Sequence, residues 1–259
     1  MPTRVILVGI GGASCSGKTL LAKHLARLLG PGHSVLIHQD DFAPTSEMVP
    51  VSPEFGVQDW DDPPTCVEWP RMRQVLGAIR QSGKVPQEHD SFDHLNAQVE
   101  VGVDGGVVHE WGTKLGQVTV TGGGEEKIVW VLVDGFVLYW DRGVSDALDV
   151  KLLMRVPRAV LKARREARAT YVLQNAEDAA TGGVWTDPPG YFDNIVYPAY
   201  VKAHASVMSG GDVENGTVTT ADITVLAPGE GEGEMTRVLG EACAVLVAAA
   251  NAGVGSYVE

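Results

Sequence analysis

The stretch Gly12-Ala13-Ser14-Cys15-Ser16-Gly17-Lys18-Thr19 decides the fold of this chain, because it is a complete G-x-x-x-x-G-K-[ST] phosphate-binding motif. The apolar run 5–10 precedes the motif, and residues 20–29 follow it with helical periodicity, as a strand–loop–helix unit requires. Glycines let consecutive backbone N–H groups turn toward one anion, and the helix adds the positive end of its dipole. The motif predicts that Lys18 reaches the outer phosphates and that Thr19 ligates Mg²⁺. The alternative is a Gly-Ser turn that contains a lysine by chance.

The length and charge of the chain limit its architecture and its partners. A chain of 259 residues is compatible with one large α/β domain or with a domain that carries an inserted arm, and we expect a single domain over 1–259. The formal net charge of −13 and the pI near 4.9 repel polyanions. We therefore expect a small-molecule substrate and neither nucleic acid nor membrane as a partner. The sequence carries no signal for the oligomeric state.

Cysteine usage and hydropathy indicate the compartment. The three cysteines, Cys15, Cys66 and Cys243, are an odd number and lie far apart, which favours reduced thiols. The N-terminal apolar run leads directly into the phosphate loop and differs from a secretory signal. The apolar segment 238–250 is too short to span a bilayer and contains Glu241, so it is predicted to be a packed helix. We expect a cytoplasmic protein.

Alternating strand and helix patterns predict an α/β fold. Apolar runs predict strands at 5–10, 34–38, 128–133, 148–156 and 223–226. Helical patterns predict helices at 19–29 and 235–250, a helix that ends at about residue 82 and a helix that begins at Pro157. The Gly- and Val-rich stretch 102–124 is predicted to form a small β-rich insert, at about 100–127.

Carboxylates follow two of the predicted strands. Asp40 and Asp41 come directly after 34–38, and Asp134 follows 128–133. Because ligands of open parallel sheets bind at the carboxyl ends of the strands, we expect these side chains beside the phosphate loop. A carboxylate there is suited to hold hydrated Mg²⁺ or to accept a proton from an attacking hydroxyl. The alternatives are a solvated Asp-Asp turn and, for Asp134, an N-cap of the following turn.

The Pro-rich stretch 43–64 is predicted to be a lid or a binding loop. Within it, Trp60 has the shape to stack on a flat ring, and Asp61 has the oxygens to accept hydrogen bonds from ribose hydroxyls. The alternative is a tryptophan packed beneath the loop, with surface carboxylates around it.

A basic helix is predicted after Pro157. It carries Lys162, Arg164, Arg165 and Arg168, and Arg164 and Arg168 lie one turn apart on a common face. Guanidinium groups suit phosphate oxygens and the charge that develops on them during transfer. The alternative is a basic helix face that is solvated or paired with surface carboxylates.

Six elements of the sequence, taken in order, resemble the nicotinamide riboside kinase family. They span residues 5 to about 226 and are the phosphate loop, His38-Gln39-Asp40-Asp41-Phe42, Trp60-Asp61-x-Pro63, Val133-Asp134-Gly135-Phe136, Arg164-Arg165-x-x-Arg168 and Asp187-Pro188-Pro189-Gly190-Tyr191-Phe192-Asp193. The resemblance implies a P-loop kinase domain of the uridine-kinase type, with a parallel five-stranded sheet flanked by helices and a lid region at about 162–187. It also implies transfer of the ATP γ-phosphate, with Mg²⁺, to the 5′-hydroxyl of nicotinamide riboside, which yields nicotinamide mononucleotide for NAD synthesis.

The same resemblance implies roles at ATP. Lys18, Arg164 and Arg168 would contact the phosphates, and Thr19 and Asp40 would hold Mg²⁺. The residues expected at ATP are Gly12, Ala13, Ser14, Cys15, Ser16, Gly17, Lys18, Thr19, Leu20, Arg164 and Arg168. The residues expected to be catalytic are Asp40, as general base, Lys18 and Asp134.

On the nucleoside side, the resemblance implies that Trp60 stacks on the pyridinium ring, Asp61 holds the ribose hydroxyls and Arg165 approaches the nucleoside. The expected substrate-binding residues are Asp40, Asp41, Phe42, Trp60, Asp61 and Arg165. An electron-rich indole and an acidic pocket suit a cationic ring better than neutral uridine. Many relatives have Glu-Gly-Phe where this chain has Asp134-Gly135-Phe136, so the charge is kept on a shorter side chain.

Two other functions are compatible with these motifs. A uridine/cytidine kinase or other small-metabolite kinase would share the phosphate loop, and a panel of substrates distinguishes it. A catalytically silent regulator would bind ATP and form no phosphorylated product.

Overall fold

A central, mostly parallel β-sheet organises the computed structural model, which describes residues 2–96, 98–121, 126–168, 170–173 and 175–258. Five strands lie in the order β2-β4-β1-β5-β8, and all neighbours in that row are parallel. Their bounds are β1 Thr3–Gly12, β2 Ser34–His38, β4 Glu126–Gly135, β5 Val150–Met154 and β8 Ile223–Leu226. Two short antiparallel strands extend the sheet, β3 (Val120–Thr121) beside β4 and β9 (Ser256–Val258) beside β1. The predicted α/β fold with a parallel five-stranded sheet is confirmed.

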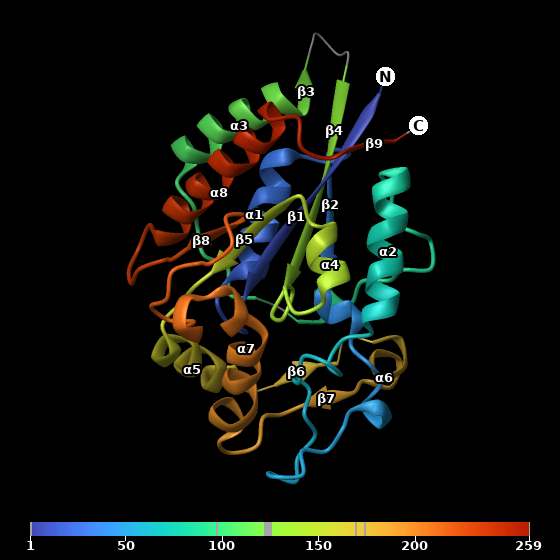
Figure 1. Ribbon diagram of the computed structural model, residues 1–259, viewed down its shortest axis with the longest axis vertical. Coiled ribbons are helices and arrows are strands. Elements are labelled where there is room, and N and C mark those ends of the chain that lie inside the picture. The colour runs from blue at the N-terminus through green and yellow to red at the C-terminus, as the bar shows by residue number, and fades with distance from the viewer. Residues whose placement is uncertain (1, 97, 122–125, 169, 174, 259) are drawn as a thin grey trace.

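Helices cover both faces of this sheet (Figure 1). One face lies under three helices that pack on one another, α1 (Lys18–Leu29), α3 (Gly105–Thr119) and α8 (Glu234–Asn251). The core on the other face includes side chains from α2 (Trp69–Ser82), α4 (Arg142–Ala147) and α7 (Tyr197–His204). In β4, Trp130 joins the first core, whereas its neighbours Val129 and Val131 join the second. Burial on both faces explains why the central strands are apolar at successive positions.

The stretch 102–124 differs from the predicted β-rich insert. Helix α3 occupies most of it, and within 102–124 only the two residues of β3 are extended strand in the described part; 122–125 lie outside the described residues. The Asp104 carboxylate caps the helix by accepting a hydrogen bond from the Val107 N–H at 3.0 Å. Leu115 is fully buried in the core shared with α1 and α8. The prediction is wrong because apolar side chains at helical spacing and the N-cap outweigh the helix-weakening glycines.

The chain between β5 and β8 borders the carboxyl end of the sheet. It contains α5 (Arg158–Ala167), β6 (Tyr171–Val172), α6 (Ala176–Thr181) and β7 (Val184–Trp185). Strands β6 and β7 pair with each other, and we call this antiparallel pair the hairpin. A π-helical turn, Phe192–Val196, then leads into α7. In Figure 1 the hairpin lies beyond the end of the central sheet where β1 runs into the phosphate loop.

The other predicted elements are present, with small differences at their ends. The strands predicted at 34–38 and 223–226 have these bounds, whereas β5 is shorter than the predicted 148–156. Helix α8 begins one residue before and ends one residue after the predicted 235–250. In the described residues, no helix combines the length and the apolarity that crossing a membrane requires.

Candidate active site

The phosphate loop joins β1 to α1. Its backbone is left-handed at Gly12 (φ 149°), Cys15 (φ 64°) and Gly17 (φ 92°). Such conformations group backbone N–H groups into a concavity that binds anions. A Cβ at Gly12 would lie 2.7 Å from the carbonyl oxygen of Met154, so only glycine fits where the loop passes β5.

One tyrosine fixes β1 directly beneath the loop. The Tyr139 hydroxyl accepts a hydrogen bond from the Gly11 N–H at 3.3 Å. Its single proton lies between two carbonyl oxygens, that of Leu152 in β5 at 2.5 Å, to which it donates, and that of Gly9 in β1 at 3.2 Å. A side chain therefore connects β1 with β5 where β1 passes into the loop.

The loop opens into a cavity of about 1290 Å³. Most of the expected site residues line it: Ser14, Cys15, Ser16, Gly17, Lys18, Thr19, Leu20, Asp40, Trp60, Asp61, Arg164, Arg165 and Arg168. The remaining expected residues are not among its lining residues: Gly12, Ala13, Asp41, Phe42 and Asp134. The fold thus brings the phosphate loop, the end of β2, the Pro-rich loop and α5 to one cavity.

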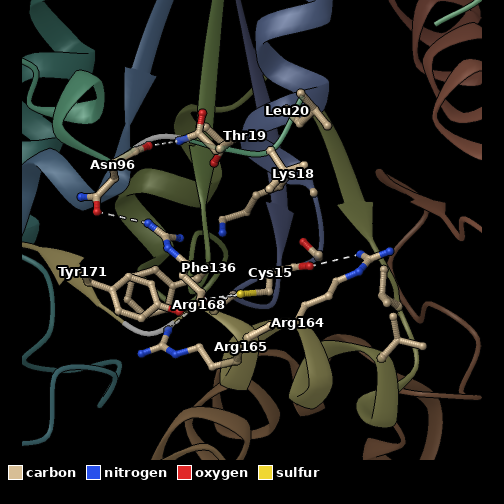
Figure 2. A pocket seen from close by; sticks show the side chains of 18 of the residues that line it. Cys15, Lys18, Thr19, Leu20, Asn96, Phe136, Arg164, Arg165, Arg168 and Tyr171 are labelled. Carbon is tan, nitrogen blue, oxygen red and sulfur yellow. Dashed lines mark hydrogen bonds between the residues drawn. The ribbon is translucent and has the colours of Figure 1, made fainter. Parts of the chain in front are cut away.

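Three cations at the cavity have no carboxylate partner in the described part of the chain. They are Lys18, Arg164 and Arg168, none of which lies within ion-pair distance of an acidic side chain there. Arg164 donates to the backbone oxygen of Cys15 at 3.2 Å, and Arg168 donates to the side-chain oxygen of Asn96 at 3.2 Å (Figure 2). Because both acceptors are neutral, these positive charges remain available to an anion.

Arg165, by contrast, is paired. Its guanidinium donates to both oxygens of Asp187, at 2.6 and 2.9 Å, and to the Ser14 hydroxyl at 2.8 Å. The ring of Tyr171 lies 4.2 Å from the Arg165 guanidinium carbon and 4.0 Å from that of Arg168. Arg165 therefore ties the phosphate loop to the chain that follows the hairpin.

Asp40 is the acidic residue at the end of β2 that faces the cavity. It lies in a 3₁₀ turn, Gln39–Phe42, and its side chain is accessible to solvent from the cavity. Desolvation of the carboxylate by the surrounding protein raises the pKa of Asp40, and the nearby positive charge of Lys18 partly offsets this shift. A raised pKa brings a carboxylate closer to the neutral range in which a general base works well.

Asp134 lies behind the loop, at the end of β4. It is buried, and its Oδ1 accepts a hydrogen bond from Nδ1 of His38 at 2.8 Å. Burial raises the pKa of Asp134, but His38, Lys18 and a hydrogen bond from Thr19 outweigh burial, so its pKa lies below the ordinary value. Burial likewise lowers the pKa of His38, yet Asp134 above all raises it to about 9. His38 and Asp134 therefore form a charged pair at neutral pH.

Asp41 and Phe42, which we expected to bind substrate, are not among the residues that line the cavity. Asp41 is buried, and its Oδ1 accepts a hydrogen bond from the Phe92 N–H at 2.8 Å. Phe42 is fully buried in the core and stacks on His89, with ring centroids 5.0 Å apart. In a 3₁₀ turn, consecutive side chains point in different directions, so the two aspartates have separate surroundings.

Aromatic side chains also line the cavity. The rings of Trp60 and Trp185 lie 5.9 Å apart at 56°, and Trp185 lies 5.4 Å from Tyr191. The Trp185 indole N–H donates to Asp187 Oδ1 at 2.9 Å. The Trp60 indole nitrogen is buried and has no hydrogen-bond partner in the described structure. The two indole rings are tilted relative to each other and do not stack, so neither ring covers the face of the other.

Asp61 lies beside these rings and is buried. Burial raises the pKa of Asp61 to about 6, and the positive charge of Arg165 opposes this shift. Asp61 lines the cavity, whereas Asp187, which accepts from the Trp185 indole, is already paired with Arg165. Acidic and aromatic side chains together favour a flat cationic group.

Several side chains that line the cavity were not predicted to be site residues from the sequence. These are His38, Asn96, Phe136, Tyr171 and Trp185. Trp185 has a recognisable signal, because it lies two residues before Asp187, where the acidic, Pro-rich stretch begins. Asn96 has none, because it lies in an irregular segment between α2 and α3, and only the fold brings it to the site.

The oxygen atoms around Thr19 suit Mg²⁺. Oδ2 of buried Asp134 has no hydrogen-bond partner in the described residues, and Asp40 and Thr19 add a carboxylate and a hydroxyl at the cavity. Mg²⁺ prefers oxygen ligands and is commonly bound by one or two carboxylates together with substrate phosphates. The described residues contain no group of three or more His, Cys, Asp or Glu placed to hold a metal alone. Phosphate oxygens would therefore have to complete such a site.

Comparison with known proteins identifies the family. No protein-family profile matches the chain. It is 34% identical over 212 residues to the nicotinamide riboside kinase of Saccharomyces cerevisiae, covering 82% of each protein. It is 32% identical over 245 residues to the nicotinamide riboside kinase of Eremothecium gossypii, covering 94% of this chain and 93% of the relative.

Among solved structures, a sugar kinase from Janibacter sp. HTCC2649 is distantly similar, with 13% identity, 95% of each chain covered and a TM-score of 0.43. The sequence relatives are much closer, and their similarity extends over most of both proteins. On that similarity, the chain belongs to the nicotinamide riboside kinase family.

Proposed function

We propose that this protein transfers the γ-phosphate of ATP to the 5′-hydroxyl of nicotinamide riboside and so forms nicotinamide mononucleotide. The observation that carries the proposal is that one cavity is lined both by cations that have no carboxylate partner in the described residues and by tryptophans with a carboxylate. The cations suit a triphosphate, and the aromatic and acidic side chains suit a pyridinium ring. Membership of the family, whose curated relatives are named for this activity, supports the same substrate.

At the phosphate end, we assign the grip on ATP to the backbone of the phosphate loop and to three side chains. Lys18 would contact the outer phosphates, and Arg164 and Arg168 would contact them from α5. Their neutral hydrogen-bond partners support this role, because their charge is not cancelled by protein carboxylates. Phosphoryl transfer depends mainly on positioning and on neutralising phosphate charge, and these groups supply both.

The transfer itself needs a group that accepts one proton. The nucleoside 5′-oxygen would bond to the γ-phosphorus, the bond from that phosphorus to the β–γ bridging oxygen would break, and ADP would leave. The proton of the 5′-hydroxyl would pass to the carboxylate of Asp40. Access to the cavity and a raised pKa support Asp40 as this base.

Thr19 and Asp40 would hold Mg²⁺, and Asp134 would lie beside them. When bound, Mg²⁺ supplies positive charge to the phosphate oxygens. The hydrogen bond from Thr19 to Asp134 and the charged pair of Asp134 with His38 keep these oxygen atoms in place. Asp134 therefore acts from behind the loop, without lining the cavity.

At the nucleoside end, Trp60 and Trp185 would face the pyridinium ring, and Asp61 would accept hydrogen bonds from the ribose. Arg165 would act indirectly, because Nε and Nη2 of its guanidinium already donate to the carboxylate of Asp187. Its remaining contact with Ser14 connects the nucleoside end to the phosphate loop.

We infer a cytoplasmic enzyme that works as one kinase domain over 1–259. The three cysteines are free thiols, which suits a reducing compartment. The residues that line the cavity come from the phosphate loop, the Pro-rich loop and α5, so they are drawn from distant parts of the chain.

The test is to identify the product. Purified protein, nicotinamide riboside and Mg-ATP are expected to give ADP and an equal amount of a 5′-phosphomonoester, followed by mass spectrometry and ³¹P NMR. Lys18→Ala is expected to abolish both products. ADP without a phosphorylated nucleoside would indicate hydrolysis, and ATP binding without turnover on any nucleoside would indicate a silent regulator; either result contradicts the proposal.

A further inference from the structure

A short segment between α2 and α3 connects separate parts of the cavity wall. We call residues 92–96 together with Gln98 the strap. Its Phe92 N–H is fixed by the buried carboxylate of Asp41 at 2.8 Å. Its Asp93 forms an ion pair with Lys23 of α1 at 2.5 Å and accepts a hydrogen bond from Gln98 at 3.0 Å. The strap is therefore anchored to the end of β2 and to the helix that follows the phosphate loop.

At its far end, the strap holds the hairpin through one side chain. The Asn96 amide nitrogen donates to the Val172 carbonyl at 2.7 Å, and the Val172 N–H donates to the Asn96 amide oxygen at 3.0 Å. These are the two hydrogen bonds that a neighbouring strand residue would make with β6. Asn96 is buried, with 7% of its surface exposed, so water competes little for these bonds.

The same oxygen of Asn96 also orients a cation. Arg168 donates to it at 3.2 Å, and its guanidinium lies over the ring of Tyr171 (Figure 2). An amide oxygen has two lone pairs, so it accepts from Val172 and Arg168 together. An aspartate here would also accept both bonds, but its charge would pair with Arg168 and cancel the positive charge.

We propose that Asn96 is a positioning residue that holds Arg168 toward the phosphate end of the cavity while leaving its charge uncompensated. The strap supplies this residue from outside the phosphate loop and α5. Arg168 lies close enough to Asp40 for its positive charge to stabilise the Asp40 carboxylate, and both side chains line the cavity. The proposal rests on the proposed function only in taking the ligand of Arg168 to be a nucleotide phosphate.

A double-mutant cycle tests it, with binding of an unreactive Mg-ATP analogue measured by calorimetry and no nucleoside present. Asn96→Ala is expected to weaken binding about three- to tenfold, as loss of a hydrogen bond to a charged group would. In an Arg168→Ala background, the same substitution is expected to have almost no further effect. Equal losses in the two backgrounds, or no loss on either single substitution, would overturn the proposal.

Asn96→Asp separates positioning from simple packing. It keeps the size and the acceptor oxygen of asparagine but cannot donate to the Val172 carbonyl, so a purely structural role predicts a loss of binding that does not depend on Arg168. Our proposal predicts that Asn96→Asp binds the nucleotide more weakly than Asn96→Ala, and that this difference shrinks in the Arg168→Ala background, because the new carboxylate cancels the charge of Arg168. Nucleotide binding by Asn96→Asp that equals or exceeds that of Asn96→Ala would contradict it.

Asn175→Ala is the matched control. Asn175 is also a buried asparagine near the hairpin, but its side chain bonds to the Pro44 carbonyl and to Asp178, not to an arginine. It is expected to leave analogue binding unchanged. Amide hydrogen exchange at Val172 is expected to rise in Asn96→Ala and not in Asn175→Ala, a readout that is independent of kinase activity. Unchanged exchange at Val172 in Asn96→Ala would also overturn the proposal.

Discussion

At the scale of single residues, the adjacent carboxylates of Asp40 and Asp41 have different roles. Asp40 faces the cavity, whereas Asp41 fixes the strap through the Phe92 N–H. Asp40→Asn is expected to lower kcat by about 10²–10⁴, as loss of a general base does, and to leave affinity for the ATP analogue within a few-fold. Steady-state kinetics and calorimetry check both parts. An unchanged kcat would exclude Asp40 as the base.

The two tryptophans give a second residue-scale prediction. Trp60→Ala and Trp185→Ala are each expected to raise the KM for nicotinamide riboside about tenfold, because each removes one face for the cationic ring. The KM for ATP should stay unchanged, since the side-chain contacts of the two indoles in the described residues are with each other, with Tyr191 and with Asp187. Trp140→Ala is a matched control, because Trp140 is partly exposed and outside the cavity lining. If the nucleoside KM stays constant in both variants, the indoles only pack the protein.

The pKa of Asp61, raised to about 6 by burial, predicts a pH dependence of nucleoside binding. A carboxyl group with a raised pKa takes up its proton at a higher pH than usual, so its ionised fraction falls as the pH drops through about 6. Affinity for the cationic nucleoside should fall with it. Titration of binding between pH 5 and 8 checks this, and Asp61→Asn should remove this dependence. A profile that is the same in the wild type and in Asp61→Asn would contradict the role.

At the scale of elements, the end of β1 depends on a side chain for its position. The Tyr139 hydroxyl joins β1 and β5 beneath the phosphate loop. Tyr139→Phe is expected to lower the free energy of unfolding by about 1–3 kcal/mol, because it leaves the buried Gly11 N–H without its partner. Urea unfolding measures the change. A loss below about 0.5 kcal/mol would mean that water or a backbone shift replaces the hydroxyl.

The elements differ in how well the sequence predicts them. The central strands are predicted because burial on both faces makes them apolar at each position, and the helix after the loop is predicted by its motif. Helix α3 is missed because Gly105, Gly106, Gly112 and Gly116 suggest turns. Those glycines occur in a helix whose apolar face packs on α1 and α8, and packing between elements distant in sequence is not visible in a local pattern.

At the scale of the whole molecule, ordered motifs predict which segments form the site but not which side chains meet. The loop, Asp40, Trp60 and Arg164 all reach the predicted cavity. The pairing of Arg165 with Asp187 and the contact of Asn96 with Arg168 do not follow from spacing, because each partner comes from a different element. Such pairs decide which charges remain free for a ligand, and they require the fold.

The whole molecule is also strongly acidic, with a formal charge of −13, yet it has free cations at the cavity. That overall charge repels a polyanion. A small nucleotide, by contrast, is attracted by the local positive charge of Lys18, Arg164 and Arg168, and a cationic nucleoside is attracted by the carboxylate of Asp61. The division of charge within one cavity is the physical basis of the proposed substrate choice.

The most direct test of that division is the ratio of kcat/KM for nicotinamide riboside to kcat/KM for uridine, measured with Mg-ATP in one assay. Both substrates offer a ribose 5′-hydroxyl, and they differ in the charge of the ring. The tryptophans and Asp61 predict a clear preference for the cationic pyridinium nucleoside. Ready phosphorylation of uridine, with nicotinamide riboside left unchanged, would contradict the account.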